Sequence, residues 1–154
     1  MMIEIWYNKR HPTGRTPYME VYMENIAGII GRAETVVSAE NTATAAGSGN
    51  LPVFGTPFMV ALMENAASIS ISPYLNEGQS SVGTLLNISH TAATPVGMRV
   101  WAESVVTKVD DRKVSFKIKA FDESGQIGEG EHERFIIDAE KFLARTTGKS
   151  LAKK

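Results

Sequence analysis

Residues 55–72, GTPFMVALMENAASISIS, predict the helix around which the rest of the chain is arranged. Thr56 followed by Pro57 predicts a helix start, because Thr is a good N-cap and Pro is favoured at the first helical position. The residues that follow are apolar or small on nearly every side, and Glu64 is the one charged residue among them. A surface helix has one apolar stripe and one polar face, so we predict that this helix is buried all round and ends at Pro73.

Length and composition limit what the chain can be. Its 154 residues, of which 43% are hydrophobic and 21% charged, are typical of one soluble domain with its own core. A net charge of −1 argues against a nucleic-acid binder, and the central apolar run is shorter than the roughly 20 residues of a membrane span.

Residue types exclude several kinds of site. The chain has no cysteine, which excludes thiol nucleophiles, disulfides and cysteine-based zinc sites. Its three histidines are far apart and have no metal-ligand spacing, so we expect no metal. The N-terminus lacks the apolar segment of a signal peptide, and we therefore expect a cytoplasmic location.

The chain divides into three predicted parts. Residues 1–24 form an irregular extension in which prolines and a glycine interrupt any regular element. Residues 25–143 form the domain, and residues 144–154 form a basic, solvated tail. Before the central helix we predict a strand over 31–38 and a helical turn over 40–46.

Four more strands follow the helix, because β-branched and alternating residues are separated there by short turns rich in Gly, Pro, Asn and Asp. They are predicted over 81–89, 98–109, 113–121 and 126–137. One antiparallel sheet wrapped on one apolar helix is an α+β layout. Such a sheet covers only one side of a helix that is buried all round, so we expect a second copy in a symmetric homodimer.

Three polar residues stand out against apolar or small neighbours. Thr56 could supply a hydroxyl nucleophile or be a plain helix cap. Glu64 could be a general base, or it could lie at an exposed edge or pair with an arginine. His90 ends a predicted strand, and it could carry protons at neutral pH or bond a backbone group.

Helix geometry restricts how these residues can act together. Glu64 lies eight positions after Thr56, which corresponds to a rise of about 12 Å, beyond hydrogen-bond reach. Either a substrate lies between them, or His90 bridges part of the gap, or the set is completed across a dimer interface.

His132 and Arg134 share a face of the last strand. They could form an anion-binding pair, but a structural cross-strand pair is favoured. Gly83 weakens its strand unless a backbone or a ligand must come close. Arg112, Lys113 and Arg134 are candidates for binding phosphates, although a solvated strand edge is favoured for Arg112 and Lys113.

Three segments together resemble a known family: LPVFGTPFMVALMENAA, SVGTLLNISHTAATPVGM and IGEGEHERFIID. They are similar to the fluoroacetyl-CoA thioesterase-like family of the hotdog-fold thioesterases, over roughly residues 27–142. The resemblance implies a curved antiparallel sheet around a central helix and an active site at a dimer interface. It also implies hydrolysis of an acyl-CoA thioester without a cofactor, since coenzyme A is part of the substrate.

The resemblance also implies roles for single residues. Thr56, Glu64 and His90 match the family's catalytic set, and Gly83 matches a position that lines the acyl site. We add Phe54 and Arg134 as candidate substrate-binding residues. Fluoroacetyl-specific members carry aromatic residues in the loop before the helix, whereas residues 46–50 here have none, so a more open acyl pocket is expected.

The predicted function is therefore hydrolysis of a short or medium acyl-CoA by a homodimer of this fold. The alternative is a non-catalytic protein of the same fold that binds acyl-CoA or another small molecule, because a fold alone does not give an activity. A hydratase of this fold would use an Asp/His pair near the helix start, and the sequence has none there.

Overall fold

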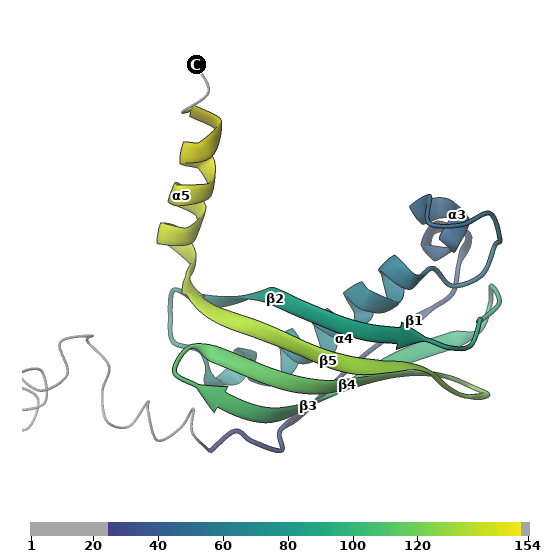
Figure 1. Ribbon diagram of the computed structural model, residues 1–154, viewed down its shortest axis with the longest axis horizontal. Coiled ribbons are helices and arrows are strands. Elements are labelled where there is room, and N and C mark those ends of the chain that lie inside the picture. The colour runs from purple at the N-terminus through teal and green to yellow at the C-terminus, as the bar shows by residue number, and fades with distance from the viewer. Residues whose placement is uncertain (1–24, 152–154) are drawn as a thin grey trace, which may run out of the picture.

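A five-stranded antiparallel sheet and one long helix make up most of the structure, a computed structural model that describes residues 25–151 (Figure 1). The strand order is β1-β3-β4-β5-β2. The strands are β1 Ile30–Val36, β2 Gln79–His90, β3 Arg99–Asp110, β4 Lys113–Asp122 and β5 Gly125–Asp138. The helices are α3 Ala43–Ala46, α4 Thr56–Ile71 and α5 Ala139–Leu151, with 3-10 turns η1 Ala39–Asn41 and η2 Ser72–Tyr74.

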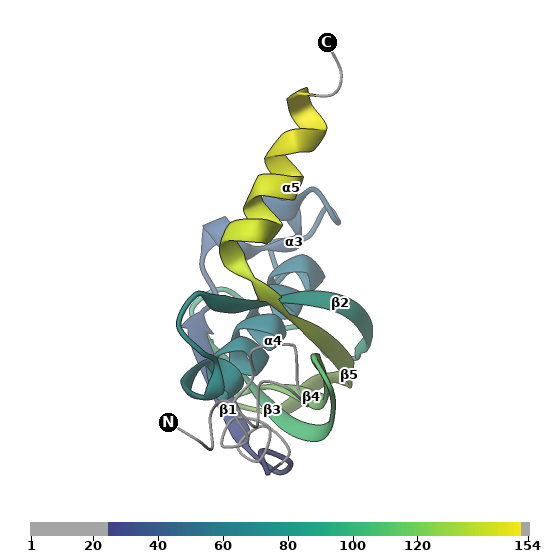
Figure 2. The same ribbon diagram turned by 90° about the vertical axis from the view of Figure 1, so that its left-hand side faces the viewer.

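The sheet curls around α4, as the view in Figure 2 shows. The helix packs chiefly on β1 and β3. Gly31 permits this close approach, since a Cβ at that position would run into the Ala66 carbonyl of α4. Along β4 the side chains of Val114, Phe116 and Ile118 are all buried, as their alternation predicted. The α+β layout with a curved sheet around a central helix is confirmed.

Within the single chain α4 is covered on one side only, as expected for one sheet, and burial of its other side by a second copy stays a prediction. Pro57, Ala61, Asn65 and Ile69 form an exposed line, in which Ile69 is 47% exposed. They are four residues apart and therefore lie on one side of the helix. The physical reason is that one sheet covers only the opposite side. The buried residues of α4 are Met59, Leu62, Met63, Ala66, Ala67, Ser70 and Ile71.

The prediction that Thr56 caps the helix was wrong. Gly55 is the N-cap, with extended backbone angles, and makes no side-chain cap bond. Thr56 is the first helical residue, and its hydroxyl is bonded to His90 instead. The predicted helical turn over 40–46 is split into η1 and α3 at Thr42, whose side chain caps α3 by accepting from the Ala45 amide.

The helix α5 continues into residues 144–151, where a basic, solvated tail was predicted. All residues of α5 from 141 to 150 are exposed, so the solvation is as expected although the segment is helical. Figure 1 shows α5 standing away from the sheet. The predicted extension over residues 1–24 lies outside the described residues, and no helix within 25–151 is long and apolar enough to cross a membrane.

Candidate active site

The hydroxyl of Thr56 and the ring of His90 are in contact. The Thr56 Oγ1 lies 2.8 Å from the His90 Nδ1. The sheet brings them together, because His90 is the last residue of β2 and Thr56 is the first of α4. His90 Nδ1 can take the hydroxyl proton of Thr56 if this nitrogen carries none itself, which is the arrangement of an activated nucleophile.

The surroundings of His90 favour its neutral form. Burial lowers the pKa of its imidazole, and the backbone of Ala92 opposes this in part. Its Nε2 is buried without a hydrogen-bond partner among the described residues. A neutral imidazole with one nitrogen on Thr56 and a free second nitrogen can pass a proton between two reacting groups.

A hollow of about 280 Å³ opens beside this pair. Its walls are formed by small residues and one phenyl ring: Ala43, Ser48, Val53, Phe54, Thr56, His90, Thr91, Ala92 and Ala93. Phe54, a predicted substrate-binding residue, is buried in this wall. The residues of the loop before α4 that line the hollow have no aromatic side chain other than Phe54.

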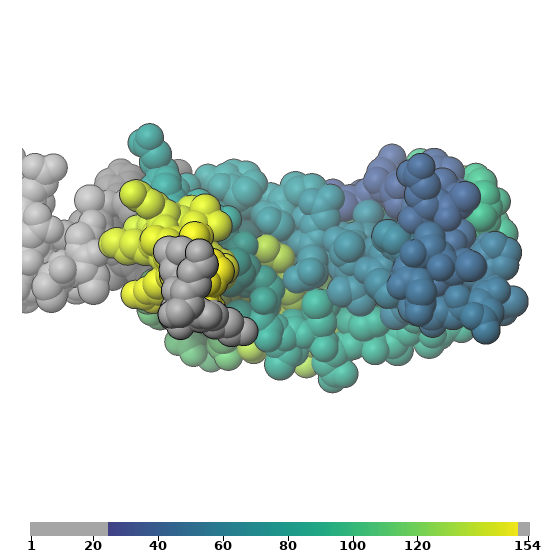
Figure 3. All heavy atoms as spheres, turned by 90° about the horizontal axis from the view of Figure 1, so that it is seen from above, coloured from purple at the N-terminus to yellow at the C-terminus, as the bar shows by residue number. Residues whose placement is uncertain are grey.

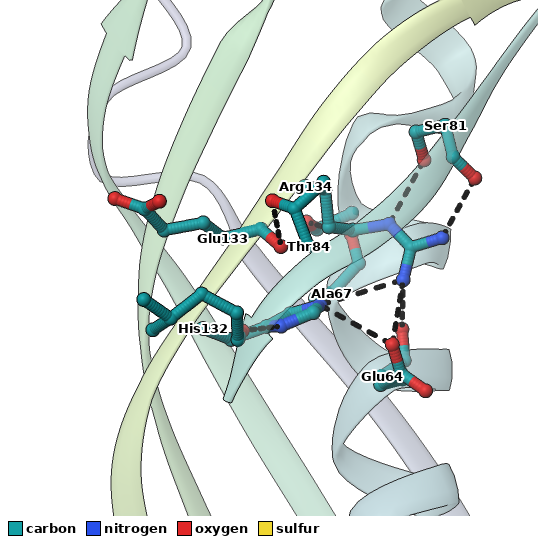
Figure 4. Close-up of polar contacts among 9 residues, drawn as sticks. Glu64, Ala67, Ser81, Thr84, His132, Glu133 and Arg134 are labelled. Atoms are coloured by element: carbon teal, nitrogen blue, oxygen red, sulfur yellow. Dashed lines mark hydrogen bonds and ion pairs between the residues drawn. The ribbon is translucent and has the colours of Figure 1, made fainter. Parts of the chain in front are cut away.

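Glu64, on α4, forms a second cluster with side chains of β2 and β5 (Figure 4). Its Oε1 lies 3.8 Å from Nη1 of Arg134 and 4.0 Å from Nε2 of His132, and its side chain is 36% exposed. Arg134 donates from Nε to Ser81 Oγ at 2.9 Å and from Nη2 to the Ser81 carbonyl at 2.8 Å. In this cluster Glu64 Oε1 lies near the Arg134 guanidinium, and the Glu64 carboxylate stays partly exposed to solvent.

Gly83 makes room for this carboxylate. A Cβ at Gly83 would collide with Glu64 Oε1 and lie 3.2 Å from Cε1 of His132. The residue next to it, Thr84, is a bulge, since Gly83 pairs with Arg134 whereas Leu85 pairs with Glu133. Bulges of this kind re-aim side chains beside functional sites. The group that comes close at Gly83 is thus the Glu64 side chain, where a backbone or a ligand was expected.

The predicted residues form two groups within one protomer. Thr56 and His90 touch each other, but no contact found within residues 25–151 links them to Glu64. The spacing of eight positions between Thr56 and Glu64 on α4 explains this separation. Glu64 pairs with an arginine, which was one of the interpretations offered for it. His132 and Arg134 also contact each other, with 3.4 Å between His132 Nε2 and Arg134 Nη1.

Two candidate phosphate-binding residues lie on the surface. Lys113 Nζ is paired with Glu133 at 3.1 Å, and the Arg112 guanidinium lies over the Phe135 ring at 5.1 Å. No group of three or more His, Cys, Asp and Glu that could hold a metal gathers in the described part of the chain. Sequence reasoning missed Ser81 as the anchor of Arg134, because no pattern in the sequence marks the pairing of two strands 53 residues apart.

The chain is similar to known proteins in both sequence and structure. The family of the fluoroacetyl-CoA-specific thioesterase FlK matches residues 37–140. A fluoroacetyl-CoA thioesterase from Streptantibioticus cattleyicolor is 43% identical over 100 residues, which cover 65% of this chain and 72% of that protein.

Solved structures agree with the sequence match. A point mutant of the fluoroacetyl-CoA-specific thioesterase FlK superposes with a TM-score of 0.76 at 36% identity, over 80% of this chain and 96% of that chain. A thioesterase superfamily member from Thermus thermophilus gives a TM-score of 0.77 at 31% identity, over 85% of this chain and all (100%) of that chain. The resemblance seen in the sequence is thus confirmed: the chain is a hotdog-fold protein that belongs to the fluoroacetyl-CoA-specific thioesterase family.

Proposed function

We propose that this protein hydrolyses the thioester of a short or medium acyl-CoA to the free acid and coenzyme A. The observation that carries the proposal is the Thr56–His90 contact of 2.8 Å beside a hollow at the N-terminal end of α4. Membership of a thioesterase family supports it. A mutant of FlK has been solved with fluoroacetate and CoA, so that protein accommodates both halves of such a thioester.

Thr56, Glu64 and His90 are the proposed catalytic residues. The α4 N-terminus favours negative charge developing on the thioester oxygen. His90 accepts the proton of the attacking Thr56 hydroxyl, or Glu64 accepts that of an attacking water, and the proton is then returned to the leaving thiolate. Attack by Thr56 gives an acyl ester that water then cleaves, whereas attack by water activated at Glu64 gives the acid in one step.

We further propose that the working unit is a homodimer. The strand β2 is an edge of the sheet and has no buried residue. Figure 3 looks onto this face, where the teal surface of α4 and β2 lies between α5 in yellow and the blue segment that contains α3. An open strand edge beside the exposed line of α4 suits a second copy of the same surface.

If β2 pairs with its own copy about a two-fold axis, the two strands run antiparallel. The end of β2 that carries His90 in one protomer then lies towards the part of the partner subunit's β2 that contains Gly83. We therefore propose that Thr56 and His90 of one protomer act with Glu64 of the partner subunit. In this arrangement Thr56 and Glu64 can face one substrate although they lie about 12 Å apart along α4 within a single protomer.

A thiol-release assay tests the activity. Because the chain has no cysteine, a thiol reagent detects only the coenzyme A set free. We expect turnover of one or more acyl-CoAs from a panel that runs from acetyl and fluoroacetyl to medium chains. Thr56→Val, Glu64→Gln and His90→Asn should each lower kcat/KM by about a hundredfold or more. No turnover of any acyl-CoA by the intact protein would overturn the proposal, and tight binding without turnover would favour the non-catalytic alternative.

Mixing two inactive variants tests the shared site. A heterodimer of Thr56→Val and Glu64→Gln has one intact site if the residues come from two protomers, and none if they come from one. Random mixing should then restore about a quarter of the wild-type activity. Activity that stays at the level of the parent variants after subunit exchange contradicts the shared site.

A further inference from the structure

His132 is a buried polar residue that the proposed reaction does not use. Its side chain is 0% exposed and stacks on Phe116 with ring centroids 5.7 Å apart. Its Nδ1 lies 2.8 Å from the Leu85 carbonyl oxygen. A carbonyl oxygen can only accept, so Nδ1 carries a proton and donates it to Leu85.

The second ring nitrogen of His132 faces a cation. Nε2 lies 3.4 Å from Nη1 of Arg134, which can only donate, so Nε2 is the acceptor of this contact and carries no proton. Burial lowers the pKa of His132 and Arg134 lowers it further, while the Leu85 backbone, Glu64 and Glu133 act in the other direction. His132 is thus a neutral imidazole whose tautomer follows from its two neighbours.

Arg134 is held from three sides. Ser81 accepts from its Nε and Nη2, the Glu64 carbonyl oxygen accepts from Nη1 at 3.4 Å, and His132 also faces Nη1. The two bonds to Ser81 hold the guanidinium plane on one side, and at Nη1, the nitrogen that faces the Glu64 carboxylate, the acceptors are His132 Nε2 and the Glu64 carbonyl oxygen, each at 3.4 Å. Figure 4 shows Nη1 between the imidazole and Glu64.

The bulge in β2 makes this arrangement possible. Thr84 interrupts the pairing with β5 and bonds the Glu133 carbonyl through its Oγ1 at 3.2 Å. Directly after it, the Leu85 carbonyl oxygen accepts from the His132 ring. A local departure from regular pairing thereby provides the acceptor that selects the His132 tautomer.

From these contacts we infer that His132 is a positioning residue: as the Nδ1–H tautomer, it holds the Arg134 guanidinium against Glu64 and so orients the carboxylate. The catalytic consequence rests on the proposed thioesterase function. The tautomer and the arginine contact do not depend on it.

Two amide variants separate the two ends of the ring. In His132→Asn the amide nitrogen replaces Nδ1 and keeps the bond to Leu85, but nothing reaches Arg134. In His132→Gln the longer amide brings its oxygen to the place of Nε2 and supplies an acceptor to Arg134. We expect His132→Asn to lower kcat about tenfold with little change in KM, and His132→Gln to keep more of the wild-type kcat at a similar Tm.

A purely structural role predicts a different outcome. In that case both variants lose activity in proportion to their loss of Tm, or His132→Gln is no better than His132→Asn. Either result overturns the inference, because it shows that the acceptor facing Arg134 has no effect of its own.

Nitrogen NMR of labelled histidine gives a readout that needs no activity. The chain has three histidines, and His90→Asn and His11→Asn identify their signals. We expect His132 to show a protonated Nδ1 and an unprotonated Nε2 at neutral pH. A protonated Nε2 overturns the inference. An intact protein that cleaves no acyl-CoA but shows the expected tautomer overturns the proposed function and leaves the positioning of Arg134 in place.

Discussion

Replacing Gly83 by alanine is expected to reduce catalysis with little effect on stability. The new Cβ would occupy the place of Glu64 Oε1, and the His132 ring at 3.2 Å would have to yield by a few tenths of an ångström. The atom that must move farthest is the end of a flexible side chain. Glu64 therefore rotates away, and its contact of 3.8 Å with Arg134 is lost.

The cost in folding free energy follows from these contacts. The Glu64 side chain is 36% exposed, so loss of its ion pair costs at most about 1 kcal/mol after solvent screening. Gly→Ala also stabilises by about 0.4–1 kcal/mol through the unfolded state where the backbone tolerates it. We expect a net change within about 1 kcal/mol, which corresponds to a Tm shift of roughly 2–4 °C for a chain of this length.

The expected cost in catalysis is much larger. A catalytic group displaced by about 1 Å can lose on the order of a hundredfold in rate. We expect Gly83→Ala to lower kcat/KM by about tenfold to a hundredfold in the thiol-release assay, with Tm followed by calorimetry. Gly148→Ala is the matched control, because nothing lies within 4 Å of a Cβ at Gly148 and the residue is in α5.

The double variant with Glu64→Gln identifies the route of the effect. If Gly83 acts through Glu64, the two losses in kcat/KM are not additive in free energy. Wild-type kcat/KM in Gly83→Ala would contradict the prediction, because it would show that displacing Glu64 does not slow the reaction. Fully additive losses, or a destabilisation of more than about 3 kcal/mol, would contradict it as well, since either would show that Gly83 has a role apart from Glu64.

Three further outcomes are expected. Thr94→Val removes the donor to the buried Asp122 Oδ2 at 2.8 Å, which should cost about 1–3 kcal/mol of stability and lower the Tm in calorimetry, whereas an unchanged Tm would contradict this bond's contribution. The pKa values of His90 and His132 are lowered in the folded chain, so the unfolded chain binds protons first as the pH falls below about 6.5. The free energy of unfolding should therefore decline on acidification below that pH. His90→Asn should flatten the dependence of Tm on pH. Light scattering should give about twice the monomer mass of 16.8 kDa, and a mass near 16.8 kDa itself at assay concentration would contradict the homodimer.

Local sequence patterns predicted the elements of this fold well. The alternation of Val114, Phe116 and Ile118 marked β4, and turn residues marked its ends, because strand period and turn chemistry depend on neighbours in the chain. The apolar run after Gly55 predicted α4 for the same reason. Residue type alone could not tell whether the Thr56 hydroxyl caps the helix or bonds another element.

Burial and partners depended on the packing of distant segments. The exposed side of α4 follows from the sheet covering only the other side, and helical periodicity cannot reveal this when both sides are apolar. The helix α5 and the anchoring of Arg134 by Ser81 were likewise not expected, since neither has a distinctive spacing.

Local patterns were enough to identify the residues that could carry chemistry and the elements that hold them: a hydroxyl at the start of α4, a carboxylate within it and an imidazole at the end of β2. Their partners became known from the packing of the elements. His90 meets Thr56 across 34 residues of chain, while Glu64 meets Arg134 and His132 at a bulge in β2. The reason is that spacing along a helix or strand is a local property, whereas contacts between elements depend on how the sheet curls around α4.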